Sequence, residues 1–214
     1  YGFLPSSGAV TIIYGSDEGL NPQTSKRFHQ DTHGIPGRNE ENDQWGATLI
    51  AADFSEDGID DLIVGSPNES IGEKQQSGSI TILYGSRDGI SSQKSTRIHQ
   101  GSFGIQDSNE AFDRWGSVLT TGDFNGDSKI DLVIGAPAEG SGTFLRTGAI
   151  TIIPGTAGLL TSREAKTIHQ DQIPSNLDIS HADHWGDALG SVDVNGDGKT
   201  DLLVASSAKS IGTQ

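Results

Sequence analysis

Residues 115–137 read WGSVLTTGDFNGDSKIDLVIGAP, in which two short stretches of strand character are separated by an acidic turn. The same pattern returns as WGATLIAADFSEDGIDDLIVGSP at 45–67 and as WGDALGSVDVNGDGKTDLLVASS at 185–207. The tryptophans that begin the three stretches therefore stand 70 residues apart in a chain of 214 residues. Self-similarity at a fixed period predicts a repeat architecture that covers nearly the whole chain.

Each unit of 70 residues contains four segments of strand character and no window with the apolar spacing of a helix. In the central unit these segments are 115–124, 131–137, 148–155 and 167–170. Four antiparallel strands in a tandemly repeated unit are typical of a β-propeller blade. We therefore predict an all-β fold in which residues 1–214 form a single domain of β-propeller blades.

The chain begins and ends in the middle of a predicted blade. Residues 1–44 contain only the third and fourth strands of a unit, 45–114 and 115–184 are complete units, and 185–214 contain only the first and second strands. Three repeats fall short of a closed propeller, and unpaired strand edges are unfavourable. We expect this half-propeller to be completed either by a second copy in a head-to-tail homodimer or by further blades of a longer chain.

The composition restricts the classes of function. With 14 Lys and Arg against 29 Asp and Glu, the net charge is −15, which argues against binding to nucleic acid or to an anionic membrane surface. No stretch approaches the roughly 20 apolar residues of a spanning helix, so we expect no membrane insertion. The chain has no cysteine and lacks the HExxH, GxSxG and P-loop motifs. We therefore predict a non-enzymatic protein. The absence of cysteine fits an exported protein but does not by itself place the chain outside the cell or at its surface.

An acidic loop joins the first two strands of every unit, at 53–61, 123–131 and 193–201, with the pattern D-x-[NS]-x-D-[GS]-x-x-D. Side-chain oxygens at positions 1, 3, 5 and 9 and the carbonyl oxygen of position 7 can converge if the backbone turns sharply at position 6. Such an oxygen-only shell suits Ca²⁺ better than Mg²⁺, which demands stricter octahedral geometry. We predict three calcium ions per chain. The predicted ligands are Asp53, Ser55, Asp57, Ile59 and Asp61 in the first loop, Asp123, Asn125, Asp127, Lys129 and Asp131 in the second, and Asp193, Asn195, Asp197, Lys199 and Asp201 in the third.

The predicted calcium loops differ from EF-hands. Position 12 is Val64, Ile134 or Val204, where an EF-hand carries a bidentate Glu, and strands rather than helices flank each loop. Position 6 is glycine in the first and third loops but Ser128 in the second, and glycine tolerates a positive φ best. We therefore expect the second loop to be the most strained of the three.

These features resemble the FG-GAP repeat of integrin α-chain β-propellers and their bacterial relatives. The family's Phe-Gly appears as Trp-Gly in all three units, and its Gly-Ala-Pro is intact at 135–137, altered to Gly-Ser-Pro at 65–67 and lost at 205–207. The resemblance covers all three units, and the acidic loops lie between the two motifs, where the family carries its own. It implies a β-propeller with structural calcium at one end, used for adhesion and ligand binding.

Alternation of strand direction places the calcium loops at one end of the blades and the loops that vary between units at the other. The variable loops carry Phe and Arg side chains, which suit recognition, so we expect a protein or glycan ligand there. These side chains are Arg38, Phe103, Phe112, Arg114, Phe144 and Arg146. Two alternatives stay open, a carbohydrate-binding lectin and a non-catalytic propeller accessory to an enzyme that acts on polysaccharides.

Three further sets of repeated side chains are expected to be structural. We expect the tryptophans to pack between blades, the aspartates two residues before them to accept hydrogen bonds, and the histidines to form structural hydrogen bonds. The three sets are Trp45, Trp115 and Trp185, then Asp43, Asp113 and Asp183, and then His29, His99 and His169.

Overall fold

The computed structural model describes residues 4–141, 145–174 and 179–210, and within them the fold is all-β, as predicted. These residues contain twelve β-strands and one short 3₁₀ helix, η1 (Gln170–Gln172), with no α-helix. No helix in these ranges has the length and apolar character needed to cross a bilayer. The strands are β1 (Val10–Ser16), β2 (Gly19–Phe28), β3 (Thr48–Ala52), β4 (Asp61–Ser66), β5 (Ser79–Tyr84), β6 (Ser91–Ile98), β7 (Val118–Gly122), β8 (Asp131–Ala136), β9 (Ala149–Ile153), β10 (Lys166–His169), β11 (Ala188–Val192) and β12 (Asp201–Ala205).

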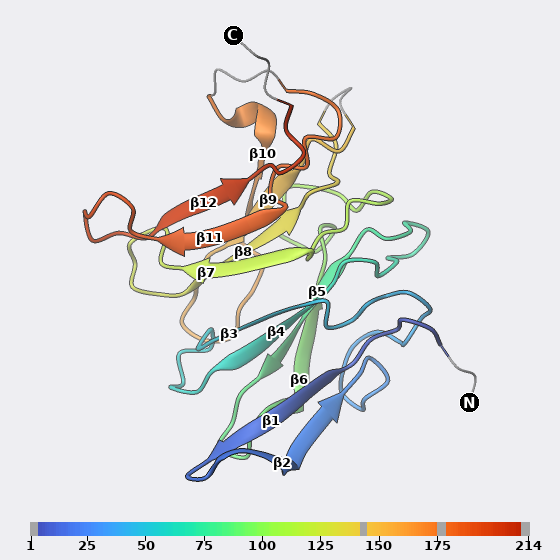
Figure 1. Ribbon diagram of the computed structural model, residues 1–214, viewed down its shortest axis with the longest axis vertical. Coiled ribbons are helices and arrows are strands. Elements are labelled where there is room, and N and C mark those ends of the chain that lie inside the picture. The colour runs from blue at the N-terminus through green and yellow to red at the C-terminus, as the bar shows by residue number, and fades with distance from the viewer. Residues whose placement is uncertain (1–3, 142–144, 175–178, 211–214) are drawn as a thin grey trace.

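The strands form four antiparallel sheets, in the phase that the repeats predict. Two sheets are complete blades with the orders β3-β4-β5-β6 and β7-β8-β9-β10, and they lie between the two-stranded sheets β1-β2 and β11-β12. Figure 1 shows the four sheets following one another along the long axis of the molecule, from β1-β2 to β11-β12, without closing into a ring.

The first strand of each unit lies innermost, where strands of successive blades meet. β3 contacts β7, and β7 contacts β11. The first hairpins also share one register, because Leu49 pairs with Val64 and Leu119 pairs with Ile134, two pairs that are equivalent in the repeat. The repeated sequence therefore produces repeated geometry, as expected for propeller blades.

Two of the fourth strands are longer than the sequence indicates. The pattern places the first of them at 27–30, whereas β2 begins at Gly19, and the equivalent β6 begins at Ser91. Most residues of β2 are exposed and polar, so they show no apolar alternation, and only backbone pairing with β1 makes them a strand. The fourth strand of the central unit, β10, starts within one residue of its predicted position.

Hydrophobic cores fill the junctions between sheets, with a tryptophan in each of the first two. Trp45 is 1% exposed between the β1-β2 sheet and the following blade, and Trp115 is 0% exposed between the two complete blades. Their indole nitrogens donate to Thr81 Oγ1 at 3.1 Å and to Thr151 Oγ1 at 2.9 Å. Packing between blades is thus confirmed for these two tryptophans, and their burial excludes them as stacking platforms for sugars, whereas Trp185 is only half-buried.

Candidate calcium loops and ligand-binding face

The three acidic loops join β3 to β4, β7 to β8 and β11 to β12. Figure 1 shows all three at the same end of the strands, on the left of the view. The last pair of each hairpin joins the residue before position 1 of the loop to position 9, as in Ala52 with Asp61 and Gly122 with Asp131. Each hairpin thereby brings the first and last acids of its loop to neighbouring strand ends.

Within each loop the acidic side chains organise the backbone. In the second loop, Asp123 accepts hydrogen bonds from the amides of Gly126 at 2.7 Å and Ser128 at 2.9 Å. Asn125 Oδ1 accepts from the amide of Asp127 at 2.8 Å, and Asp127 Oδ1 accepts from position 7 at 2.9 Å. The third loop repeats this set of bonds at similar distances. The amide N–H groups hold the oxygens of positions 1, 3 and 5 in one fixed turn.

The turn requires a positive φ at two positions, of which the sequence indicated one. Position 6 has φ values of 84° at Gly58, 66° at Ser128 and 81° at Gly198. Position 4 also has a positive φ, and in the first loop this position is Glu56, with φ 57°. The first and second loops therefore each carry one non-glycine residue in the left-handed region, which is unfavourable for residues with a Cβ. The expectation that the second loop is the most strained of the three rested on position 6 and did not consider Glu56 at position 4 of the first loop.

The acid at position 9 connects the loop to the next strand of the blade. Asp61 accepts from the amide of Ser55 at 2.9 Å and from the amide of Gly85, at the end of β5, at 2.8 Å. Asp131 makes the equivalent bond with Gly155 at 2.8 Å. Burial raises the pKa of both carboxyl groups, although these amide hydrogen bonds oppose the shift. Position 9 therefore has a structural role in addition to any role as a ligand.

The donor set of the loops fits a hard cation. Each loop offers carboxylate, amide or hydroxyl, and carbonyl oxygens, and no nitrogen or sulfur ligand. In the third loop, backbone hydrogen bonds, that of Gly198 first, lower the pKa of the fully exposed Asp193, which keeps that carboxylate charged. The loop acids are nevertheless spread out, because within the described ranges no three of them bring ligand atoms within 4.8 Å of one another.

The one group of three acids that does meet this distance lies outside the loops. It consists of Glu110, Asp113 and Glu139 at the junction of the two complete blades. The repeat predicts a structural role for Asp113 and distinguishes neither glutamate from other acids. No sequence motif joins these residues, since 26 positions separate the second acid from the third, and only the packing of two blades brings them together.

The opposite end of the blades carries a pocket of about 210 Å³. It contains two arginines, a phenylalanine and a histidine from loops of both complete units. The lining residues are Gln76, Phe112, Arg114, Ala138, Arg146 and His184. Three side chains predicted for recognition therefore meet here. Arg38 is exposed and lies outside this pocket, and Phe144 lies outside the described residues.

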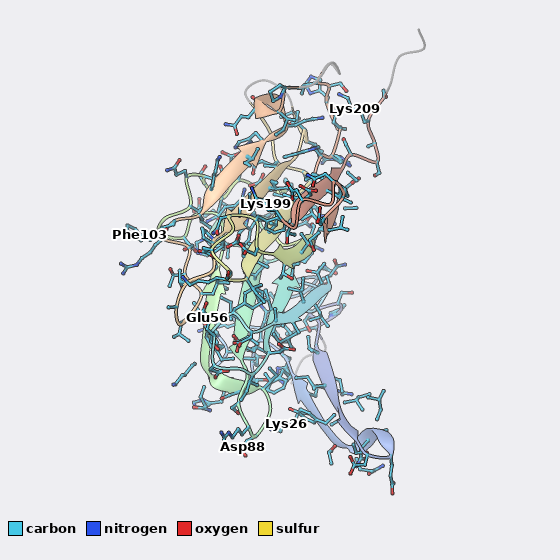
Figure 2. The ribbon with its side chains drawn as sticks, turned by 90° about the vertical axis from the view of Figure 1, so that its left-hand side faces the viewer. Lys26, Glu56, Asp88, Phe103, Lys199 and Lys209 are labelled. Carbon is cyan, nitrogen blue, oxygen red and sulfur yellow. The ribbon has the colours of Figure 1, made fainter. Side chains whose placement is uncertain are left out.

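Phe103 does not join this pocket. Its side chain is 83% exposed and projects from the surface in Figure 2. It instead borders a cavity of about 300 Å³ together with Tyr84, Leu159 and Leu160. A further pocket of about 410 Å³, lined in part by Ser55 and Tyr84, lies beside the first acidic loop, and no feature of the sequence indicated it.

The repeated aspartates and two of the repeated histidines have the structural roles expected of them. Asp43, Asp113 and Asp183 each accept a hydrogen bond from the amide three residues earlier, at 2.8, 2.7 and 2.9 Å. The Nδ1 atoms of His29 and His99 lie 3.2 and 3.1 Å from the amide nitrogens of nearby asparagines. His169 differs, because its Nε2 lies 3.9 Å from a carboxylate oxygen of Asp107.

Comparison with known proteins agrees with the repeat. The family described as FG-GAP repeat matches residues 45–83, 115–153 and 185–213. The chain is 33% identical over 162 residues to a phosphatidylinositol-glycan-specific phospholipase D of Rattus norvegicus, covering 75% of this chain and 18% of that protein. It is 31% identical over 169 residues to integrin alpha-X of Mus musculus, covering 77% of this chain and 13% of that protein. The chain therefore spans less than a fifth of the length of these relatives.

Proposed function

Because the chain belongs to the FG-GAP repeat family, we propose that it is an extracellular β-propeller module for ligand binding or adhesion, stabilised by calcium. The observation that carries this proposal is the threefold recurrence of one loop geometry. Each of the three hairpins presents oxygen donors at one end of its blade, on a turn held by the same acid-to-amide hydrogen bonds. Turn formation alone does not require four oxygen side chains at the same offsets three times.

In this proposal each loop binds one calcium ion, giving three per chain. The ligands are the residues at positions 1, 3, 5 and 9 and the carbonyl oxygen of position 7. The ion neutralises carboxylates that otherwise repel one another, and it cross-links the two strands that the loop connects. The role of each ion is therefore structural, and the ligand of the module binds at a different place.

The ligand is proposed to bind at the opposite end of the blades. The pocket there contains Arg114 and Arg146, and no salt bridge joins either guanidinium to an acid among the described residues. Two arginines beside Phe112 suit a protein or glycan group that carries a carboxylate. This pocket contrasts with the net charge of −15 of the chain.

We further propose that the two half-blades are completed by another copy of the chain or by further blades. Within the described residues, β1 pairs only with β2, and β12 pairs only with β11. In the complete blades, the indole of the first strand donates to a threonine on the third strand. The equivalent residues of the half-blades are Trp185, which is half-buried and precedes β11, and Thr11, which is exposed on β1. Figure 1 shows the β1-β2 and β11-β12 sheets at opposite ends of the row of four sheets. A complete blade would bring these two positions together.

A second candidate function is that of a non-catalytic module attached to an enzyme. This candidate is favoured because the chain resembles a segment that makes up less than a fifth of a much longer phospholipase D. The expectation that the chain itself has no catalytic activity stays a prediction. Hydrolysis of a phosphatidylinositol-glycan substrate by this chain alone would contradict it.

The calcium sites are tested by native mass spectrometry and thermal unfolding of the Asp127→Ala variant. We expect this variant to bind one calcium fewer than the wild type. Its unfolding temperature should fall much more in calcium than in chelator, where only the hydrogen bond from the Lys129 amide is lost. Asp17→Ala, which removes an exposed acid from the turn between β1 and β2, is the control and should change neither. An equal loss of stability with and without calcium would contradict the assignment of this loop.

The same spectra test the completion of the blades. A species of twice the mass of the chain supports the head-to-tail homodimer, whereas a monomer favours completion by further blades.

A further inference from the structure

The fold contains three equivalent blade junctions in which a repeated aspartate is buried beside a second charged side chain. At the first junction, Asp43 and Glu69 are 2% and 3% exposed, and Arg97 Nη1 lies 2.8 Å from Glu69 Oε1. At the third junction, Lys209 Nζ lies 2.7 Å from Asp183 Oδ2. Buried carboxylates are costly unless paired, and at these two junctions a cationic side chain of the protein supplies the pairing.

The middle junction contains more acids than the others. Ligand atoms of Glu110, Asp113 and Glu139 all lie within 4.8 Å of one another. Asp113 is 3% exposed and Glu139 is 1% exposed. Two of the three carboxyl groups are thus withdrawn from water and face each other across the boundary between blades.

The cationic side chains of the other junctions are replaced at this one. In the 70-residue repeat, the residue equivalent to Arg97 is Thr167, and the residue equivalent to Lys209 is Glu139 itself. The position of Gly37, where a Cβ would lie 3.2 Å from Arg97 Nη1, is taken here by a further acid, Asp107.

Two side chains with nitrogen donors, a lysine and a histidine, lie in the neighbourhood without forming a salt bridge with the three acids. Lys74 lowers the pKa of Asp113 by charge attraction, and the imidazole Nε2 of His169 lies 3.9 Å from Asp107 Oδ2. Within the described parts of the chain, no salt bridge joins either group to Glu110, Asp113 or Glu139. The three acids of this junction therefore have no side-chain counterion within the described residues.

A buried glutamine is directed into this group of acids. Gln100 is 0% exposed, and its Nε2 donates to Glu139 Oε2 at 2.6 Å and to Asp107 Oδ2 at 3.4 Å. Its amide oxygen has no hydrogen-bond partner within the described residues. A buried oxygen without a donor calls for an explanation such as a bound water or ion. Gln30 at the first junction also has such an oxygen, so the two junctions differ in their cation rather than in their glutamine.

From this geometry we propose that the middle junction binds a calcium ion, in the place that the cationic groups of Arg97 and Lys209 occupy at the other two junctions. The ligands are the carboxylates of Glu110, Asp113 and Glu139. The amide of Gln100 turns its nitrogen toward Glu139 in the structure, and its oxygen joins the ligands once the amide turns over. All of these donors are oxygens, which favour a hard cation over zinc or copper. The site lies outside the three acidic loops and does not depend on them, so it is a fourth calcium site per chain.

In the absence of a cation, burial favours the protonated forms of these acids. Burial raises the pKa of Glu139 to about 9, and the neighbouring carboxylates of Asp113 and Asp107 add to the effect. Burial likewise raises the pKa of Asp113 to about 7. A divalent ion between these groups would stabilise their charged forms by opposite charge. Ion binding at this junction would then hold the two complete blades together.

The test places the residue types of the first junction at the equivalent positions of the middle junction. The double variant Asp107→Gly/Thr167→Arg reproduces the arrangement of Gly37 and Arg97, and it fills the junction with a guanidinium instead of a metal. Glu139→Gln removes one ligand with little change in size. Calcium is counted by native mass spectrometry at pH 8, and thermal unfolding is measured in calcium and in chelator.

We expect both variants to bind one calcium fewer than the wild type. The double variant should also unfold at a higher temperature than the wild type in chelator, and calcium should raise its unfolding temperature by less. An unchanged calcium count in both variants would overturn the proposal, and it would mean that the acids hold a proton or water instead.

The loop variant Asp127→Ala distinguishes this proposal from the proposed function. If Asp127→Ala loses one calcium while the junction variants lose none, the loop sites stand and the junction site is refuted. If the junction variants each lose one calcium and Asp127→Ala loses none, the junction site stands and the assignment of the second loop is refuted. Combining Asp127→Ala with Glu139→Gln should remove two calcium ions, since the two sites share no ligand.

Discussion

Replacing Thr151 by valine should destabilise the chain by leaving a buried donor without its acceptor. Thr151 is 1% exposed on β9, and its Oγ1 accepts the indole N–H of Trp115 at 2.9 Å. Trp115 is itself 0% exposed. Valine has nearly the same shape as threonine, so the change removes the hydroxyl while it leaves the packing between the blades in place.

The expected cost follows from this burial. An unsatisfied buried donor costs about 1–3 kcal/mol, and the indole N–H has no route to water while both side chains stay buried. For a chain of this length, about 2 kcal/mol corresponds to a decrease of about 4–8 °C in the midpoint of thermal unfolding. The bond itself should appear as a coupling of about 1 kcal/mol in a double-mutant cycle with Trp115→Phe.

Urea unfolding followed by circular dichroism measures these differences, with Thr11→Val as the matched control. Thr11 is the equivalent residue of the β1-β2 sheet, but it is exposed, and its Oγ1 accepts a hydrogen bond from the exposed Nε of Arg27 at 3.3 Å. We expect its replacement to change the stability of the monomer by less than about 0.5 kcal/mol. A cost for Thr151→Val below that value, or a cost equal to that of Thr11→Val in a monomer, would refute the argument. A large cost for Thr11→Val in an associated species would instead support a completed blade.

Three further predictions concern the backbone and the blade junctions. Gly78→Ala should lower the free energy of unfolding several times as much as Gly158→Ala. Both residues have a positive φ, but only at Gly78 would a Cβ lie 2.1 Å from a carbonyl oxygen of the next blade. Similar unfolding temperatures for the two variants would count against this close approach. Burial raises the pKa of Asp43 to about 6 from its ordinary 3.8, so the stability that its protonated form contributes is complete below pH 3.8 and is lost as the pH rises toward 6. Denaturant unfolding measured between pH 3.8 and pH 6 should show that the free energy of unfolding falls less steeply with pH in Asp43→Asn than in the wild type. Parallel curves of stability against pH would exclude Asp43 as the titrating group. Arg97→Ala should lower the free energy of unfolding by about 3 kcal/mol at pH 8, because the buried Glu69 loses its cationic partner and keeps the hydrogen bond from Gln30 Nε2. Arg97→Ala/Glu69→Gln should recover part of this loss, and no recovery would mean that Arg97 acts through packing alone.

Features that depend on local sequence were predictable. The 70-residue period, the four strands of each complete unit, the half-blades at both ends and the positive φ at position 6 all depend on residues that are close in the chain. The limits of local reasoning appear at Gly19 and Ser91, where two fourth strands begin earlier than predicted. Their exposed polar residues carry no apolar alternation, and only pairing with the neighbouring strand makes them extended.

The sequence by itself therefore determined the blade repeat, its phase and the three acidic loops, because hydrogen bonding and strand alternation act over a few residues. Only the tertiary structure decided that Glu110, Asp113 and Glu139 meet at one blade junction and that Phe103 lies apart from Arg114 and Arg146. These relations join side chains from different strands and loops, and their distances are set by how two sheets pack. The charged side chains of a junction likewise come from segments that are far apart in the sequence. Their net charge is therefore known only once the packing of the two blades is known.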